Sequence, residues 1–222
     1  MHLQVKNLNL IKSKINEIIN KKKLIIPNLN IIAVSKTFST ERIIPLIEAQ
    51  HYHFGENKVQ EAEKKWPEIR KKYQNIKLHM IGKLQSNKAK KAVNLFDFIH
   101  SVDSIKLAER IDRFEKDLNK KVKIFIQINV GKEDQKSGVA IQDLDNFYNY
   151  CTKKLSLNVI GLMCLPPENE ISSDYFKILN ELSTKLKLKE LSMGMSNDYL
   201  DAINYGATYL RIGRSIFGKR DI

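Results

Sequence analysis

Hydrophobic and polar positions along this chain follow two different periods. Short apolar runs rich in β-branched residues, such as 31–34 and 122–130, are bounded by polar or turn-forming residues and predict buried strands. Between them lie longer segments in which apolar residues recur every three or four positions, which is typical of amphipathic helices. The first of these segments places Leu8, Ile11, Ile15, Ile18 and Ile19 on one face. The chain is therefore predicted to alternate between strands and helices.

The pattern predicts eight strands in all. They lie near residues 31–35, 52–55, 77–81, 97–101, 122–130, 157–163, 190–192 and 207–212. Helical patterns separate almost every pair, which favours parallel strands, and eight such units predict a (β/α)8 TIM barrel. A doubly wound open sheet is the competing arrangement, but no Gly-rich dinucleotide fingerprint follows the first strand. We expect one barrel domain over residues 1–222, with an N-terminal helix in 1–25 that packs on the barrel.

Composition and charge narrow the class of protein. Hydrophobic residues make up 42% of the 222, enough for a sizeable core. The 38 Lys and Arg residues exceed the 25 Asp and Glu residues by 13, and such a balance can indicate a nucleic-acid partner. The lysine clusters at 20–23, 70–73 and 88–91 adjoin apolar residues at helical spacing, as solvated helix faces do. We therefore expect no nucleic-acid partner and keep nucleic-acid binding only as an alternative hypothesis.

The two cysteines, Cys151 and Cys164, show no metal-ligand spacing, so we expect reduced thiols and no metal site. The N-terminus has no apolar region typical of a signal peptide. No apolar run approaches the ~18 residues that a membrane span needs. These features predict a soluble cytoplasmic protein that does not contact a membrane.

Candidate chemistry lies in the loops after the strands, which form the active face of such barrels. Lys36 stands two residues beyond the first apolar run, and lysine is seldom fully buried unless something pairs or reacts with it. The loops after strands seven and eight, "SMGMSND" and "RIGRSIFG", place small residues before helical segments, where barrels often bind phosphate. Gly194 and Gly213 would let the backbone approach an anion, and Ser196 would add a hydroxyl donor.

A lysine amine that faces a phosphate site suggests a phosphorylated aldehyde held as an imine, because burial disfavours the ammonium form. Pyridoxal 5'-phosphate (PLP) fits this description. Arg211 could contact its ring nitrogen, since Asp or Arg are the usual partners of that atom. Arginine stays protonated and would disfavour the pyridinium, which makes the cofactor a poor electron sink. The alternative for Arg211 is a salt bridge inside the barrel.

At these residues the chain resembles the pyridoxal phosphate homeostasis protein family, small proteins related to the N-terminal barrel of alanine racemase. The matching stretches are "AVSKTFS", "FGENKVQE", "HMIGKLQSNK", "HSVDS", "QINVGKEDQKSG", "GLMCLPP" and "LSMGMSNDYLDAINYGATYLRIGRSIFGKR". They follow in order from residue 33 to the C-terminus, so the resemblance covers almost the whole chain. It implies an alanine racemase N-terminal-domain-like barrel.

The resemblance also implies roles for individual residues. Lys36 matches the lysine that forms the imine with PLP, Arg211 matches the arginine near the ring nitrogen, and Asn57 matches the asparagine that lines the pocket. Family members are thought to carry or buffer PLP in vitamin B6 homeostasis, without established catalytic turnover.

Three further residues match the phosphate end of that site. Ser196, Gly213 and the backbone of Arg214 match positions that hold the phosphate. Arg214 stands where Ser or Thr is common, so Ser215 is the nearby candidate to supply a hydroxyl.

A PLP-dependent amino-acid racemase is the alternative function. Racemisation needs two bases, one on each side of the α-carbon, and Lys36 could be only one of them. In racemase relatives the opposing base comes from a second domain, whereas this chain ends ten residues after residue 212. Neither Tyr205 nor Tyr209 is predicted to face Lys36, and lone histidines such as His79 and His100 are more often structural. We therefore expect a monomeric PLP carrier without catalytic residues, with PLP-dependent apo-enzymes as its recipients.

Overall fold

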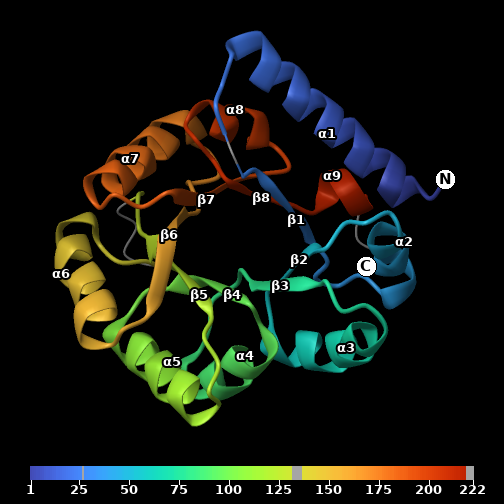
Figure 1. The fold of residues 1–222 in the computed structure, drawn as a ribbon. Coiled ribbons are helices and arrows are strands. Elements are labelled where there is room, and N and C mark those ends of the chain that lie inside the picture. Colours follow the sequence, from blue (N-terminus) through green and yellow to red (C-terminus); the bar gives the residue numbers. More distant parts are fainter. Residues whose placement is uncertain (27, 132–136, 219–222) are drawn as a thin grey trace.

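In the computed structural model, eight parallel strands close into a barrel in which each strand pairs with the next and β8 pairs with β1 (Figure 1). The strands are β1 (Asn30–Val34), β2 (His53–Glu56), β3 (Lys77–Met80), β4 (Phe98–Val102), β5 (Lys123–Ile128), β6 (Asn158–Cys164), β7 (Glu190–Met195) and β8 (Tyr209–Ile212). The closed barrel confirms the predicted fold class and excludes the open sheet. The structure describes residues 1–26, 28–131 and 137–218, so 132–136 and 219–222 of the quoted stretches lie outside it.

Helices surround the barrel (Figure 1). They are α1 (Leu3–Lys22), α2 (Thr40–Glu48), α3 (Val59–Lys72), α4 (Ala89–Leu95), α5 (Ile105–Asp117), α6 (Leu144–Asn149), α7 (Ser172–Lys185), α8 (Tyr199–Asn204) and α9 (Arg214–Phe217). Short 3-10 helices at Ser86–Lys88 and Ile141–Asp143 lead into α4 and α6, and a π-helical turn, Tyr150–Lys154, follows α6. Within the described ranges, no helix is long and apolar enough to cross a bilayer.

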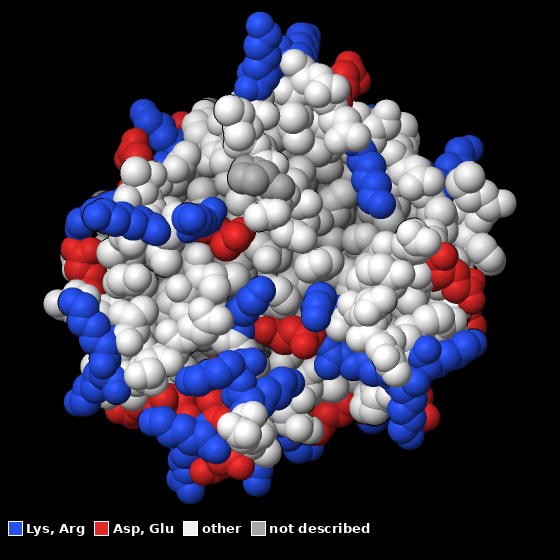
Figure 2. Space-filling view, in the orientation of Figure 1, with Lys and Arg blue, Asp and Glu red and all other residues white. Residues whose placement is uncertain are grey.

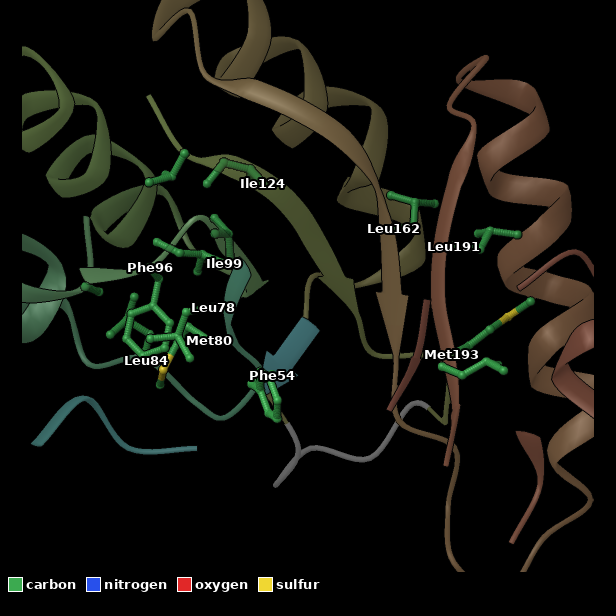
Figure 3. Packing of buried hydrophobic residues seen from close by; sticks show 14 of the residues in the cluster. Phe54, Leu78, Met80, Leu84, Phe96, Ile99, Ile124, Leu162, Leu191 and Met193 are labelled. Atoms are coloured by element: carbon green, nitrogen blue, oxygen red, sulfur yellow. The ribbon is translucent and has the colours of Figure 1, made fainter. Parts of the chain in front are cut away.

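The alternation of strand side chains divides the buried apolar residues into two clusters. The larger cluster lies between the strands and the helices and includes Phe54, Leu78, Met80 and Phe96, which gather in Figure 3. The smaller cluster fills the barrel interior with Ile32, Phe98, Phe125, Met163 and Tyr209. Because successive strand residues point to opposite faces, β1, β4, β5, β6 and β8 contribute to both clusters. A residue's place in its strand therefore decides whether its side chain reaches the interior.

α1 lies against the end of the chain that follows the last strand. Its buried residues Leu8, Ile11 and Ile15 recur at helical spacing on one face, as the sequence pattern predicts. Asn7 Nδ2 donates a hydrogen bond to the backbone oxygen of Ile216 at 3.0 Å. α1 therefore runs beside α9, as Figure 1 shows.

Charged side chains are distributed around the barrel. On the face shown in Figure 2, Lys and Arg gather around the rim with Asp and Glu beside them, and much of the centre is uncharged. This mixed distribution is typical of solvated helix faces rather than of one continuous basic surface. Cys151 and Cys164 are both buried and unpaired by a disulfide.

Gly161 supplies a test of how tightly β6 and β7 approach each other. It pairs with Glu190, and a Cβ atom at Gly161 would lie 2.0 Å from the backbone oxygen of Glu190. We expect Gly161→Ala to lower the free energy of unfolding by about 3 kcal/mol or more, because two paired backbones would have to separate. Urea unfolding monitored by circular dichroism measures this change.

Gly206→Ala is the matched control for that substitution. The nearest atom to its Cβ position is 3.7 Å away, so the residue has space, but its φ is +82°. The control should cost only about 1–2 kcal/mol, the penalty of the left-handed conformation. Equal losses in the two variants would contradict the close approach at Gly161.

Candidate functional site

Lys36 follows the end of β1, at the carboxyl-end face of the barrel. Ile32 belongs to the interior cluster, and the alternation along β1 puts Val34 on the same side of the strand as Ile32, with Lys36 two residues beyond the end of β1. Lys36 is half-buried. The strand therefore directs this lysine toward the mouth of the barrel.

The residue before Lys36 is held from outside the barrel by a group that we call the outer polar cluster: Ser35, Glu56, Glu61, Lys65 and Trp66. Glu56 Oε1 accepts hydrogen bonds from the Ser35 hydroxyl (2.8 Å), Lys65 Nζ (3.0 Å) and Trp66 Nε1 (3.1 Å). Lys65 Nζ also donates to the backbone oxygen of Ser35 at 3.0 Å. Burial raises the pKa of Glu56, while Lys65 acts to lower it. The cluster fixes the position of Ser35 relative to α3.

The residue after Lys36 is held by the same cluster. Thr37 has a φ of +68°, which costs a β-branched residue about 1–3 kcal/mol. Its backbone N–H donates to Glu61 Oε1, and Lys65 Nζ donates to the same oxygen at 3.0 Å. Both neighbours of Lys36 are thus anchored, so the outer polar cluster determines the direction from which Lys36 enters the site.

Arg211 points into the barrel from β8. Its side chain is buried, with 4% of the residue exposed, and its Nη1 donates to Ser192 Oγ at 2.7 Å. Its Nη2 donates to the backbone oxygen of Cys164 at 2.8 Å. Burial lowers the pKa of Arg211, while Cys164 and Asp198 act to raise it. The guanidinium is anchored by hydrogen bonds to β6 and β7, and these bonds use only two of its five N–H groups.

The turn from β8 into α9 lies beside the loop that carries Lys36. A Cβ atom at Gly213 would lie 3.4 Å from the Cβ and the backbone oxygen of Val34. The rings of Phe38 and Phe217 stack with centroids 4.7 Å apart, and Arg42 donates to the backbone oxygen of Phe217. These contacts bring the start of α9 and the loop after β1 together.

Two serines join β7 to the same turn. The Ser215 N–H donates to Ser196 Oγ at 3.3 Å, and the Ser215 hydroxyl donates to the Ser196 backbone oxygen at 3.4 Å. Both serines are half-buried, whereas Arg214 is exposed. The two hydroxyl groups are therefore closer to the interior of the turn than the Arg214 side chain is.

Asn57 follows β2, whose Gly55 pairs with Val34 of β1. Its backbone lies against Gly82, where a Cβ atom would approach the Asn57 oxygen to 2.4 Å. The absence of a side chain at Gly82 thus lets the loops after β2 and β3 pack directly together. Asn57 is half-buried beside the end of the strand that carries Lys36.

Three histidines form a hydrogen-bonded column inside the barrel. His53 Nδ1 lies 3.0 Å from His79 Nε2, and His79 Nδ1 lies 2.9 Å from His100 Nε2. His100 Nδ1 lies 2.8 Å from Ser192 Oγ, the same oxygen that accepts from Arg211. The column connects the guanidinium with the start of β2. We call these three residues the histidine column.

Burial keeps the histidine column neutral. The pKa of His79 lies far below its usual value, mainly because the ring is desolvated and, to a lesser extent, because His100 repels a positive charge on it. The pKa of His100 is also far below its usual value, mainly through desolvation and then through repulsion by Arg211. Desolvation, with Lys77 next in effect, lowers the pKa of His53 to about 4. Across the described parts of the chain, no group of three or more His, Cys, Asp or Glu side chains is arranged to hold a metal ion.

A groove reaches the two serines from outside the barrel. It has a volume of about 520 Å³ and runs between α1 and α8, where Asn7 and Lys14 line one side and Ser196, Asn197 and Ser215 the other. The groove lies at the serine end of the site, not over Lys36.

The structure brings the predicted residues to the ends of four neighbouring strands, β7, β8, β1 and β2. Sequence analysis missed Ser192 as a partner of Arg211 and treated His79 and His100 as isolated histidines. Each residue is recognisable in the sequence as an inward position of its strand, but the pairing of strands far apart in the chain decides which of them meet. The outer polar cluster was missed for the same reason.

Comparisons with known proteins identify the family and the fold. The model of the family "alanine racemase, N-terminal domain" matches residues 7–221. The chain is 38% identical over 203 residues to the pyridoxal phosphate homeostasis protein of Synechocystis sp., covering 87% of this chain and 93% of that protein. It is 37% identical over 199 residues to the Aquifex aeolicus protein of the same name, covering 86% of each. The structure of PipY from Synechococcus elongatus PCC7942 with PLP bound is similar, with a TM-score of 0.81, 35% identity, and coverage of 92% of this chain and 100% of that one.

The buried histidines predict a loss of stability in mild acid. Desolvation lowers the pKa of His51 to about 3, and the histidine column is also held neutral. Unfolded histidines bind protons below about pH 6.5, so the unfolded state gains protons that the folded state does not. Stability should therefore be full above pH 6.5 and fall toward pH 4, by roughly 1 kcal/mol per pH unit for each such histidine. Urea unfolding between pH 7.5 and pH 5 measures this slope.

His51→Gln should reduce the change of the unfolding free energy with pH by the contribution of one bound proton. His2→Gln, at an exposed position, should leave that change as it is. Burial raises the pKa values of Glu56 and Asp103, so these two carboxyl groups favour the folded state as the pH falls. Both variants keep these carboxyl groups, and the difference between each variant and the unmodified protein therefore reports on one histidine. A slope that His51→Gln does not alter would contradict the prediction.

Proposed function

Because the chain belongs to the alanine racemase N-terminal domain family and, within it, to the pyridoxal phosphate homeostasis proteins, we propose that it binds PLP and carries or buffers it in vitamin B6 homeostasis. The observation that carries the proposal is the convergence of Lys36, Arg211 and the turn at Gly213 at the ends of paired strands. These residues provide an amine, a cation and an anion-binding turn for the aldehyde, ring nitrogen and phosphate of one ligand.

Lys36 would hold the PLP aldehyde as an imine. The position of Lys36 supports this role, because it is half-buried just beyond the end of β1, and a lysine amine can form an imine with an aldehyde. The anchoring of Ser35 and Thr37 by the outer polar cluster supports it further, since an oriented amine loses less entropy when it reacts. Asn57, at the end of the neighbouring strand, would line the same pocket.

Ser196, Gly213, the backbone of Arg214 and Ser215 would hold the phosphate. The half-buried serine hydroxyls and the glycine beside Val34 support this assignment. Because Arg214 is exposed, its backbone N–H is the better candidate for a contact. The groove between α1 and α8 would give solvent access to this end of the ligand.

Arg211 would donate a hydrogen bond to the ring nitrogen with one of its remaining N–H groups. An arginine there disfavours the pyridinium form and weakens the ring as an electron sink, which favours binding of PLP over chemistry with it. The racemase alternative also lacks support for a second base. Tyr209 pairs with Asn30 at the start of β1, at the opposite end from Lys36, and burial raises the pKa of its hydroxyl to about 12. Tyr205 precedes β8 and lies near the same distant end.

The setting of the protein is part of the proposal. Two buried thiols without a disulfide are typical of a reducing compartment, so we place the protein in the cytoplasm. PLP-dependent apo-enzymes are the proposed recipients, and the monomer is the proposed state.

Lys36→Ala tests the imine. The purified protein should develop visible imine absorbance when PLP is added, and borohydride should fix the ligand on a peptide that contains Lys36. Lys36→Ala should show neither signal, because no amine is left at that position. Lys58→Ala is the matched control, since Lys58 is exposed near the same loops and should keep both signals. Imine absorbance retained in Lys36→Ala would overturn the assignment.

The same preparation separates a carrier from an enzyme. PLP-loaded protein incubated with L-alanine should racemise it no faster than free PLP at equal concentration, because racemisation needs a second base and Tyr205 and Tyr209 lie near the opposite end of the barrel from Lys36. Turnover above this background that disappears in Lys36→Ala would establish the racemase alternative.

A further inference from the structure

The donor and the acceptor of each hydrogen bond in the histidine column can be assigned from the donors and acceptors that each side chain has. Arginine has no acceptor, so Arg211 can only donate to Ser192 Oγ. Ser192 is fully buried, and His100 Nδ1 lies 2.8 Å from the same oxygen. If His100 donated to Ser192 instead, the serine hydrogen would be buried without this acceptor, which costs free energy. The serine hydroxyl therefore donates to His100 Nδ1.

This first assignment determines all the others. A neutral imidazole has one donor and one acceptor, so His100 carries its proton on Nε2 and donates to His79 Nδ1. His79 then carries its proton on Nε2 and donates to His53 Nδ1. All three histidines are thus Nε2–H tautomers. The chain of hydrogen bonds runs one way, from Arg211 through Ser192 to His53.

The histidines occupy interior positions that other residue types could fill more simply. His79 stacks on Phe98 and His100 on Phe125, with ring centroids 4.2 Å apart in both pairs. Phe, Leu or Met would fill such positions without any polar atom to satisfy. Three hydrogen-bonded imidazoles at these positions are therefore better explained by an effect on the Arg211 guanidinium, which they reach through Ser192.

We infer that the histidine column positions Arg211: His100, His79 and His53 fix the hydroxyl of Ser192 as an acceptor toward the guanidinium. This inference rests on the proposed function for its effect on the ligand, because Arg211 is the residue assigned to the PLP ring nitrogen. With Ser192 and Cys164 accepting from Nη1 and Nη2, the plane of the guanidinium is set. None of the three histidines needs to touch the ligand.

Histidine tautomers test the direction without any ligand. In 15N-histidine-labelled protein, NMR should show His53, His79 and His100 as neutral Nε2–H tautomers at pH 7.5. Ser192→Ala removes the hydroxyl that sets the direction, so the three should shift to a mixture that includes Nδ1–H forms. Ser101→Ala is the matched control: Ser101 is buried on β4 next to His100, and its Oγ has no hydrogen-bond partner, so the tautomers should not change. Nδ1–H tautomers in the unmodified protein, or no shift in Ser192→Ala, would overturn the proposal.

PLP release tests the positioning role. Three hydrogen bonds separate His79 from Arg211, and His79→Leu leaves His100 Nε2–H without its acceptor. We expect PLP to dissociate about two to ten times faster, the effect of weakening one hydrogen bond to Arg211. His79→Asn, whose amide oxygen can replace the Nδ1 acceptor, should recover most of the slower rate.

Phe98→Leu is the matched packing control. It removes the ring stacked on His79 but leaves the hydrogen bonds intact, so it should lower the unfolding midpoint while the release rate stays within two-fold. Equal acceleration in His79→Leu and Phe98→Leu would show that the histidine is merely structural and would overturn the positioning role. If PLP does not bind the unmodified protein at all, the proposed function fails, and the tautomer experiment still decides whether the column has the inferred direction.

Discussion

A permanently charged guanidinium enclosed in the barrel is the constraint on which the rest of the interior depends. Burying an unpaired cation is costly, so Arg211 requires acceptors, and β6 and β7 supply a backbone oxygen and a serine hydroxyl. Neither of these two acceptors is a carboxylate, so they do not neutralise the positive charge, which lies close to the histidine column. A second cation on His100 would add repulsion inside a low-dielectric core. The histidines accordingly stay neutral, and their neutrality makes a one-way chain of hydrogen bonds possible.

Two separate sets of contacts support the site from opposite sides of the same sheet. The outer polar cluster lies between the barrel and α3 and anchors the residues on either side of Lys36. The histidine column lies inside the barrel and reaches Arg211 through Ser192. Because strand residues alternate between the two faces, one short strand such as β2 contributes to both: Glu56 to the outer set and His53 to the inner one. Glu56 keeps one oxygen, Oε2, buried without a hydrogen-bond partner, so this arrangement carries a cost in stability.

The parts of this arrangement that depend on neighbouring residues in the chain could be predicted from the sequence. Alternating strand and helix patterns predicted the closed barrel, and a lysine just past a buried strand marked the barrel mouth. The contact of Ser192 with both His100 and Arg211 could not be predicted in the same way, since it joins residues 92 and 19 positions apart. Interior contacts of this kind depend on the stagger between strands, and a one-residue change in stagger would replace every inward residue with its neighbour. Small residues before the last helix indicated the α9 turn, but its contact with the loop after β1 depends on barrel closure.

Barrel closure through β1 and β8 is therefore the step that assembles the site. The register pairs Ile32 with Arg211 and Ala33 with Ile212, which puts Gly213 beside Val34 and leaves Lys36 two residues beyond the end of β1. A slip of one residue in β8 would turn Arg211 out of the interior. Such a slip would also leave the guanidinium without its acceptors or expose the buried apolar residues of β1, so the register is strongly favoured. The stacking of Phe38 on Phe217 adds a contact that only the native register allows. The residues that would bind a ligand are thus held by the same pairing that closes the fold, and the site should be lost only when the barrel itself opens.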